Sequence, residues 1–103
     1  MTRVLVIDDN EGVRDALRLL LELSDYDVAT AATPRAGLVE LASNPTDLVI
    51  QDMNFEEEKT SGSEGVQLFE EIRTQYPDMP VILLTAWTNL EMAVSLVKQG
   101  AAD

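Results

Sequence analysis

Three apolar runs in the chain, each rich in branched aliphatic residues, end in side chains that carry oxygen. Asp8 and Asp9 follow the first run, Asp52 follows the second, and Thr85 follows the third. Runs of this kind are typical of strands buried on both faces of a parallel sheet. Ligands of such sheets bind just beyond the carboxyl ends of the strands. If the three strands are neighbours, these four residues meet in one small acidic pocket.

The chemistry expected of this pocket is phosphoryl transfer assisted by a divalent cation. Clustered carboxylates repel one another and raise one another's pKa unless a cation lies among them. Mg²⁺, a hard ion that prefers oxygen ligands, meets that need, and an Asp beside Mg²⁺ can act as a nucleophile toward a phosphoryl group. The chain contains no His, which is no obstacle because the protein's part in this reaction is positioning and charge neutralisation.

Strand and helix signals alternate along the whole chain. The sequence predicts strands over 3–8, 27–31, 47–51 and 81–85, and helices over about 10–23, 33–43, 63–76 and 88–99. Asn10 and Thr33 can cap the first two helices, and Gly100 suits the end of the last one. This order implies a mostly parallel α/β sheet that is covered by helices on both faces.

Each predicted helix carries apolar positions at helical spacing. Those expected to face the core are Val13, Ala16, Leu17, Leu20 and Leu21 in the first helix, Leu38, Leu41 and Ala42 in the second, Val66, Leu68, Phe69 and Ile72 in the third, and Leu90, Val94 and Val97 in the fourth. Leu19 and Leu23 lie off the first stripe and could contact a partner.

The composition is that of one globular domain. The chain has 103 residues, 46% of them hydrophobic, which is enough for one core but not for two. None of its apolar stretches has the length needed to cross a bilayer. The net charge of -12 predicts repulsion from nucleic acid and from anionic membranes. The chain contains no Cys, which suits the cytoplasm.

The chain resembles the receiver domain of bacterial two-component response regulators. The resemblance rests on residues 6–10 (VIDDN), on Asp52 after the third strand, on residues 84–86 (LTA) after the fourth, and on residues 98–103 (KQGAAD). It covers the whole chain, so residues 1–103 are interpreted as one receiver domain. Residues 85–87 and 91–100 are similar to receivers of NtrC-type transcription activators. The resemblance implies a flavodoxin-like, doubly wound fold with strand order 2-1-3-4-5.

The resemblance also implies roles for the site residues. Asp52 would accept a phosphoryl group from a phosphohistidine of a sensor histidine kinase. Asp9 would bind Mg²⁺ directly and Asp8 largely through water, while Asp52 and the backbone carbonyl of Asn54 would complete the coordination by the protein. Thr85 would hydrogen-bond the phosphoryl oxygens and move inward after phosphorylation.

Two further implications concern regulation. Asn54 and Trp87 occupy positions that tune dephosphorylation in this family, although Trp87 could equally be a packing residue. The phosphorylated domain would regulate an output such as transcription, through a DNA-binding domain that lies outside these residues. The domain itself is not expected to bind nucleic acid or to act as an enzyme beyond its own phosphorylation and dephosphorylation.

The family pattern is incomplete at the end of this sequence. The family has a Lys and an aromatic switch residue on a fifth strand, and Lys59 and Lys98 match neither position. We therefore expect strand order 2-1-3-4 in a shortened form of a longer protein. The resemblance does not carry the coupling between phosphorylation and shape over to this chain. Without a fifth strand, the fourth strand becomes a sheet edge with an exposed apolar flank at 81–84, which predicts dimers or higher oligomers through edge pairing or segment exchange.

The loop after Asp52 is longer than in the family. The family commonly has a Gly eight residues after the acceptor, whereas the matching Gly65 lies thirteen residues on, so residues 56–62 contain a five-residue insertion. Most long loops of this kind are mobile surface segments. The alternative is that this loop covers the site or brings additional carboxylates near the metal.

Two other functions stay open at this point. A Mg²⁺-dependent phosphatase with an Asp nucleophile would use similar chemistry, but the phosphatase family in question separates its two Asp residues by one position, whereas Asp8 and Asp9 are adjacent. A receiver-like interaction module that is never phosphorylated is the other alternative. Turnover of a phosphate ester would favour the phosphatase, and failure to bind Mg²⁺ would favour the interaction module.

Overall fold

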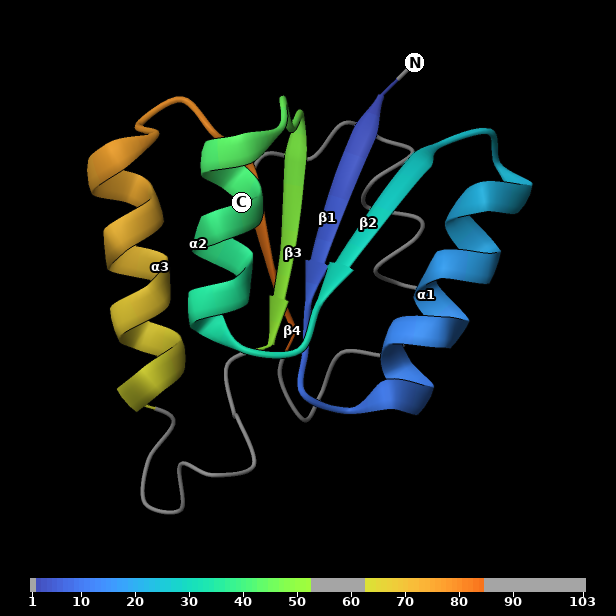
Figure 1. Ribbon diagram of the computed structural model, residues 1–103, viewed down its shortest axis with the longest axis horizontal. Coiled ribbons are helices and arrows are strands. Elements are labelled where there is room, and N and C mark those ends of the chain that lie inside the picture. The colour runs from blue at the N-terminus through green and yellow to red at the C-terminus, as the bar shows by residue number, and fades with distance from the viewer. Residues whose placement is uncertain (1, 53–62, 85–103) are drawn as a thin grey trace.

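A computed structural model describes residues 2–52 and 63–84, which form parallel strands with helices on both faces (Figure 1). The elements in chain order are β1 (Arg3–Ile7), α1 (Glu11–Leu23), β2 (Asp27–Ala31), α2 (Pro34–Ser43), β3 (Leu48–Asp52), α3 (Ser63–Gln75) and β4 (Val81–Leu84). Each lies within about two residues of its predicted range. The helix predicted over 88–99 and the insertion at 56–62 fall outside the described residues.

The strands are all parallel and lie in the order β2-β1-β3-β4. This order confirms the prediction of a doubly wound α/β sheet with order 2-1-3-4. Ile7 pairs in register with Gln51, and Asp52 pairs with Leu84. The carboxyl ends of β1, β3 and β4 therefore lie level at one edge of the sheet, which is the edge where this class of fold binds ligands.

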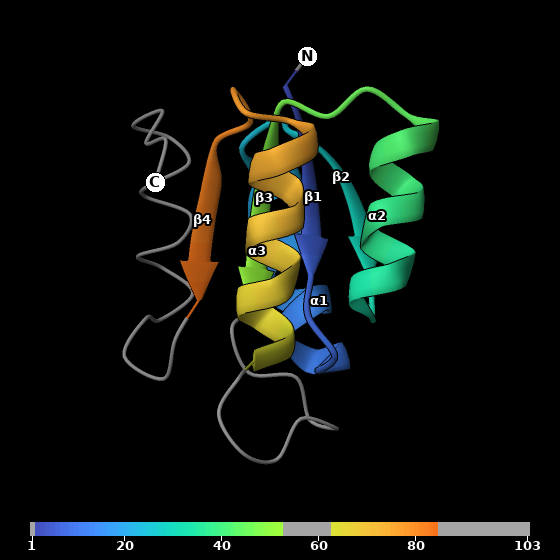
Figure 2. The ribbon, with the colours of Figure 1, turned by 90° about the vertical axis from the view of Figure 1, so that its left-hand side faces the viewer.

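The sheet is packed on both faces. In the turned view, α2 and α3 lie on one side of the sheet and α1 on the other (Figure 2). Val4 and Val6 of β1 belong to the core cluster that includes Leu17 and Leu21 of α1, whereas Leu5 and Ile7 belong to the cluster that includes residues of α2 and α3. The four β1 side chains are fully buried, as expected for a central parallel strand.

Two predicted helix starts are confirmed by their caps. The Asn10 side chain accepts a hydrogen bond from the Val13 amide at 3.0 Å, and the Thr33 hydroxyl accepts one from the Ala36 amide at 3.0 Å. Each side chain thereby satisfies one amide that has no partner within the first turn of the helix.

Two predicted core positions are wrong. Ala42 is exposed, and Val66 is 43% exposed. In α2, Gly37 and Leu41 are the buried positions, so Ala42 points about 100° away from the sheet-facing line. In α3, Leu68 and Ile72 are buried, and Val66 lies on the far side of the helix from them by the same geometry.

The apolar side chains of β4 were expected to be exposed, but three of the four are buried. Val81, Ile82 and Leu84 are buried, because the two core clusters take up side chains from both faces of this strand. Among the described strands, β4 occupies one end of the sheet. Dimer formation through this edge stays a prediction. None of the helices formed by residues 2–52 and 63–84 has the length and apolar character needed to span a membrane.

One close contact between α2 and β1 was not foreseen from the sequence. A Cβ atom placed on Gly37 would lie 2.5 Å from Ile7 Cδ1 and 2.9 Å from Ile7 Cγ1. Ile is branched at Cβ, so its side chain has few alternative rotamers with which to move aside. The absence of a side chain at Gly37 thus lets α2 approach the last residue of β1, directly before Asp8.

We expect Gly37→Ala to lower the free energy of unfolding by up to about 2 kcal/mol. Overpacking a core usually costs about 1–3 kcal/mol, and better helix propensity returns about 1 kcal/mol of this. Ile7→Val alone should cost about 0.5–1.5 kcal/mol. Combined with Gly37→Ala it should cost nothing further, because it removes the atom in closest contact. Urea unfolding followed by circular dichroism measures all three variants.

The matched control is Val6→Ala, which shortens a buried side chain on the opposite face of β1. Its cost should add to that of Gly37→Ala, since the two sites share no contact surface. Full additivity between Ile7→Val and Gly37→Ala would contradict the steric interpretation.

Candidate functional site

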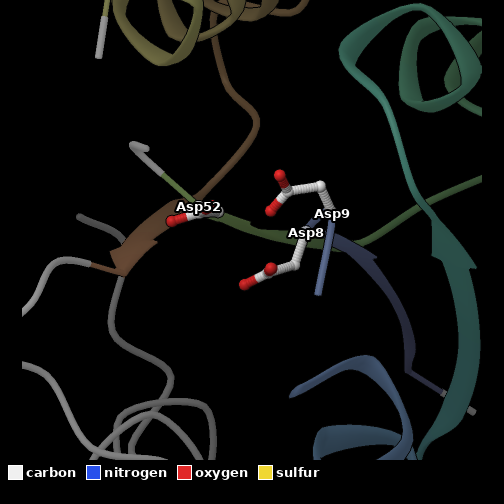
Figure 3. A group of neighbouring side chains, drawn as sticks. All are labelled: Asp8, Asp9 and Asp52. Carbon is white, nitrogen blue, oxygen red and sulfur yellow. The ribbon is translucent and has the colours of Figure 1, made fainter. Parts of the chain in front are cut away.

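Three carboxylates meet at the carboxyl edge of the sheet. Asp8 and Asp9 directly follow β1, and Asp52 is the last residue of β3. Figure 3 shows the three side chains grouped where these two neighbouring strands end. Each offers an oxygen that lies within 4.8 Å of the others. The expected convergence of these three residues is therefore confirmed.

Strand register explains why residues so far apart in sequence meet. Because Ile7 pairs with Gln51, the residues that follow these two stand next to each other, and they are Asp8 and Asp52. The Asp8 amide also donates to the carbonyl of Ala31 at 3.0 Å, which continues the pairing with β2 beyond the end of β1. Asp8 is consequently held in the sheet and is only 5% exposed, whereas Asp9 and Asp52 are half-buried.

Burial disfavours the charged form of Asp8. Loss of solvent raises the pKa of Asp8 above its ordinary value, and the neighbouring Asp9 carboxylate raises it further. The hydrogen bond from the Asn10 amide, at 2.8 Å, and the positive charge of Arg14 lower the pKa, but they do not offset the burial. The negative charge of Asp8 is therefore only partly compensated within the chain, and a cation beside it would relieve this cost.

The donor set fits Mg²⁺. An octahedral Mg²⁺ with oxygens at about 2.1 Å holds its ligands about 3.0 Å apart when adjacent and about 4.2 Å apart when opposite. The oxygens of the three carboxylates lie within 4.8 Å of one another, so small side-chain rotations bring them to this spacing. Ion and pocket agree in ligand type as well, since all three donors are carboxylate oxygens.

Arg14 is a residue of the site that the sequence analysis missed. Its Nη1 donates to the backbone carbonyl of Asp8 at 2.9 Å. A signal for it was present, because Arg14 lies near the N-terminus of α1, where the helix dipole disfavours a positive charge. A cation in that position indicates a compensating contact nearby, which is provided here by the Asp8 carbonyl and the acidic pocket.

The other predicted site residues, Asn54, Thr85 and Trp87, lie outside the described residues. β4 ends at Leu84, which pairs in register with Asp52. The end of β4, directly before Thr85, is therefore next to the acidic pocket, as the sequence pattern predicts.

Comparison with known proteins identifies the family. Residues 4–103 match the response regulator receiver domain. Response regulator protein FleR of Pseudomonas aeruginosa is 38% identical over 101 residues, which are 98% of this chain and 20% of FleR. Transcriptional regulatory protein GlrR of Escherichia coli is 39% identical over 97 residues, which are 94% of this chain and 21% of GlrR. The chain thus spans about a fifth of the length of these relatives.

The predicted NtrC-type likeness is supported by another relative. Nitrogen assimilation regulatory protein NtrX of Azorhizobium caulinodans is 28% identical over 100 residues, which are 97% of this chain and 21% of NtrX. These relatives are NtrC-family regulators.

Solved structures agree in fold. Response regulator TrrA of Thermotoga maritima, in complex with Mg²⁺-BeF, has a TM-score of 0.74 at 32% identity, covering 98% of this chain and 82% of TrrA. A structure of histidine kinase ThkA in complex with TrrA has a TM-score of 0.72 at 34% identity, covering 86% of this chain and 72% of the matched chain.

These matches agree with the strand order β2-β1-β3-β4 and with the acidic pocket at its carboxyl edge. Receiver domains of this kind are the signal-receiving parts of two-component response regulators, and the relatives named above include transcriptional regulators. They are in general signal transducers rather than enzymes. The chain belongs to the response regulator receiver domain family.

Proposed function

We propose that Asp52 accepts a phosphoryl group from a phosphohistidine of a sensor histidine kinase, and that Asp8, Asp9 and Asp52 hold the Mg²⁺ required for this reaction. The observation that carries the proposal is the meeting of three carboxylates within 4.8 Å at the carboxyl edge of a receiver fold. In this proposal the backbone carbonyl of Asn54 completes the coordination of Mg²⁺, and Thr85 hydrogen-bonds the phosphoryl oxygens. Asn54 and Trp87 tune dephosphorylation.

The reaction requires positioning rather than proton transfer by the protein. A carboxylate oxygen of Asp52 attacks the phosphorus atom, and the bond between phosphorus and the imidazole nitrogen of the donor breaks. The second ring nitrogen of the phosphohistidine takes up a proton from solvent, and the electron pair of the broken bond stays on the nitrogen that carried phosphorus, so the products are an aspartyl phosphate and a neutral His. When bound, Mg²⁺ supplies neutralisation of the charge on the phosphoryl oxygens. Asp52 is half-buried, which leaves it open to a donor from outside.

The difference in burial between Asp8 and Asp52 separates the roles of these two carboxylates. Asp8 is almost fully buried and is held by the Asn10 amide, so it suits a fixed ligand rather than a group that reacts with an external donor. Asp52 is more exposed and belongs to a strand, so it can meet a donor while its backbone stays in place. This difference supports Asp52 as the acceptor.

The partners follow from the same proposal. A sensor histidine kinase supplies the phosphoryl group, as the complex of ThkA with TrrA indicates for that pair. The output, a DNA-binding domain in this proposal, lies outside these residues, since the relatives are about five times longer. With a net charge of -12, the domain itself repels nucleic acid. We place its action in the cytoplasm, on the basis of the family and of a sequence without Cys.

We expect the wild-type chain to gain the mass of one phosphoryl group when incubated with Mg²⁺ and a small acyl-phosphate donor. Asp52→Asn should gain none, because the amide is not nucleophilic. Removal of Mg²⁺ with a chelator should abolish the gain in the wild type. Intact mass spectrometry measures each case.

Asp15→Asn is the matched control for this experiment, since Asp15 is exposed on α1 and its loss should leave phosphorylation unchanged. Equal phosphorylation of Asp52→Asn and the wild type would refute the assignment of the acceptor. Continuous release of inorganic phosphate from an ester substrate would instead favour a phosphatase.

We expect Asp8→Asn to stabilise the metal-free protein by about 1 kcal/mol, a usual size for a single substitution. The variant removes a buried charge that Asp9 repels, yet its amide oxygen can still accept from Asn10. The same variant should lose most of the stabilisation by Mg²⁺, which for the wild type is about 2.7 kcal/mol when the free ion is at 100 times its Kd.

Thermal and urea unfolding with and without Mg²⁺ measure both the stability of the metal-free protein and its stabilisation by Mg²⁺. Asp15→Asn is the control that should change neither. A metal-free Asp8→Asn protein that is less stable than the wild type would show that the Asp8 charge is already compensated within the chain.

The stability advantage of Asp8→Asn should depend on pH. Because the folded-state pKa of Asp8 is raised, ionised Asp8 destabilises the fold at neutral pH. This cost disappears as the pH falls through the folded-state pKa toward the ordinary value, since the folded protein takes up the proton first. Urea unfolding of both proteins in the absence of metal should therefore show a difference that shrinks on acidification. A difference independent of pH would exclude this explanation.

A further inference from the structure

We propose that Arg14 is a positioning residue of the cation site, whose guanidinium fixes the peptide group between Asp8 and Asp9 and thereby sets the relative orientation of their two carboxylates. The inference rests on the proposed function and extends it from the acidic ligands to a residue on α1. Arg14 would act through the backbone of the ligands rather than by touching the metal or the phosphoryl group.

The central contact is the hydrogen bond from Arg14 Nη1 to the Asp8 carbonyl oxygen, at 2.9 Å. This carbonyl belongs to the same planar peptide unit as the amide of Asp9. Rotation of that unit changes ψ of Asp8 and φ of Asp9, which decide where the two side chains point relative to each other. One bond to the carbonyl therefore restrains both carboxylates at once.

The remaining polar groups of Asp8 are held by other parts of the fold. Its amide donates to Ala31 at 3.0 Å, and its carboxylate accepts from the Asn10 amide at 2.8 Å. These contacts fix Asp8 against β2 and against the N-cap of α1. The Asp8 carbonyl, which is part of the peptide bond to Asp9, accepts its hydrogen bond from Arg14.

Arg14 is itself well anchored. Its amide donates to the Asn10 carbonyl at 3.0 Å in the first turn of α1, and its guanidinium bond to Asp8 is partly buried. Across residues 2–52 and 63–84, the ion pairs within 4.0 Å that involve arginines use Arg3 and Arg18. Arg14 directs its planar group at the Asp8 carbonyl at 2.9 Å, a closer contact than the 3.5 Å from Arg18 to the Val28 carbonyl. Such a geometry fixes orientation, and a Lys ammonium does not reproduce it.

A positioning role and a purely electrostatic role predict different ion selectivity. Mg²⁺ requires nearly ideal octahedral geometry, whereas Ca²⁺ accepts variable geometry at longer distances. Misplaced carboxylates therefore weaken Mg²⁺ binding more than Ca²⁺ binding. Loss of one positive charge beside the pocket instead strengthens the binding of both divalent cations to the same extent, because the guanidinium repels two ions of equal charge equally.

The experiment compares Arg14→Lys and Arg14→Gln with the wild type by isothermal titration calorimetry with Mg²⁺ and with Ca²⁺ at constant ionic strength. Arg14→Lys keeps the charge, and Arg14→Gln removes it. Arg18→Gln is the matched control, because it removes the same charge one turn further along α1, where Arg18 pairs with Glu22 at 3.5 Å. Urea unfolding of each variant confirms that it is folded.

We expect both Arg14 variants to weaken Mg²⁺ binding by about tenfold, the lower end of the range for groups that orient metal ligands. Ca²⁺ binding should change by less than about threefold if the loss is geometric. Arg18→Gln should leave the ratio of the two affinities unchanged. Normal Mg²⁺ binding by Arg14→Lys, or an equal change in the binding of both ions by Arg14→Gln, would overturn the positioning role.

A measurement on the wild type covers the case in which an Arg14 variant fails to fold. In nuclear magnetic resonance spectra, the Arg14 guanidinium should rotate slowly because the Asp8 carbonyl holds it at 2.9 Å. The Arg18 guanidinium should rotate faster, because its contacts with Val28 and Glu22 are longer, at 3.5 Å. Fast rotation of both would overturn the inference. A folded wild-type protein that binds no Mg²⁺ would refute the proposed function itself, whereas unchanged Mg²⁺ binding by the Arg14 variants would refute only the role of Arg14.

Discussion

The concentration of negative charge at one edge of the sheet is the constraint around which this domain is arranged. Three carboxylates offer oxygens within 4.8 Å of one another, and one of them, Asp8, is 5% exposed. Such a group destabilises a fold unless it is compensated. The Asn10 amide and the Arg14 cation compensate Asp8 in part, yet its pKa stays raised by burial and by Asp9. Because the charge of Asp8 is only partly compensated, a cation bound beside it would stabilise the fold.

The scaffold that holds this charge is rigid because the central strands are packed on both faces. The β1 side chains at Val4–Ile7 are fully buried, two against α1 and two against α2 and α3. The approach of Gly37 to Ile7 brings α2 against the residue that precedes Asp8. The position of the carboxylates is thus determined by core packing close to them, and substitutions in the core can alter the site without touching it.

A receiver domain needs neither His nor Cys for its chemistry, and this chain has neither. In the proposed reaction, the site holds metal ligands and an acceptor in fixed relative positions. The residues concerned lie at the end of β1, at the N-cap of α1 and at the end of β3. With about a fifth of the length of its relatives, the chain represents the part of such proteins that contains this site.

The sequence by itself determined the local features: the order of elements, the two helix caps, the parallel fold class and the identity of the three carboxylates. These are readable because a buried parallel strand is a continuous apolar run and because a capping side chain acts within three residues. The face of each helix that packs on the sheet was predicted less well, as the exposed residues Ala42 and Val66 show. The reason is that apolar residues also occur on the exposed faces of helices.

Only the tertiary structure decided the contacts between elements. The need for Gly at position 37 arises from the distance between α2 and Ile7, and no local pattern reports such a distance. The bond from Arg14 to the Asp8 carbonyl depends on where α1 crosses the end of β1. The unequal burial of Asp8 and Asp52 has the same origin, because burial and electrostatics depend on distances in space that spacing along the chain does not determine.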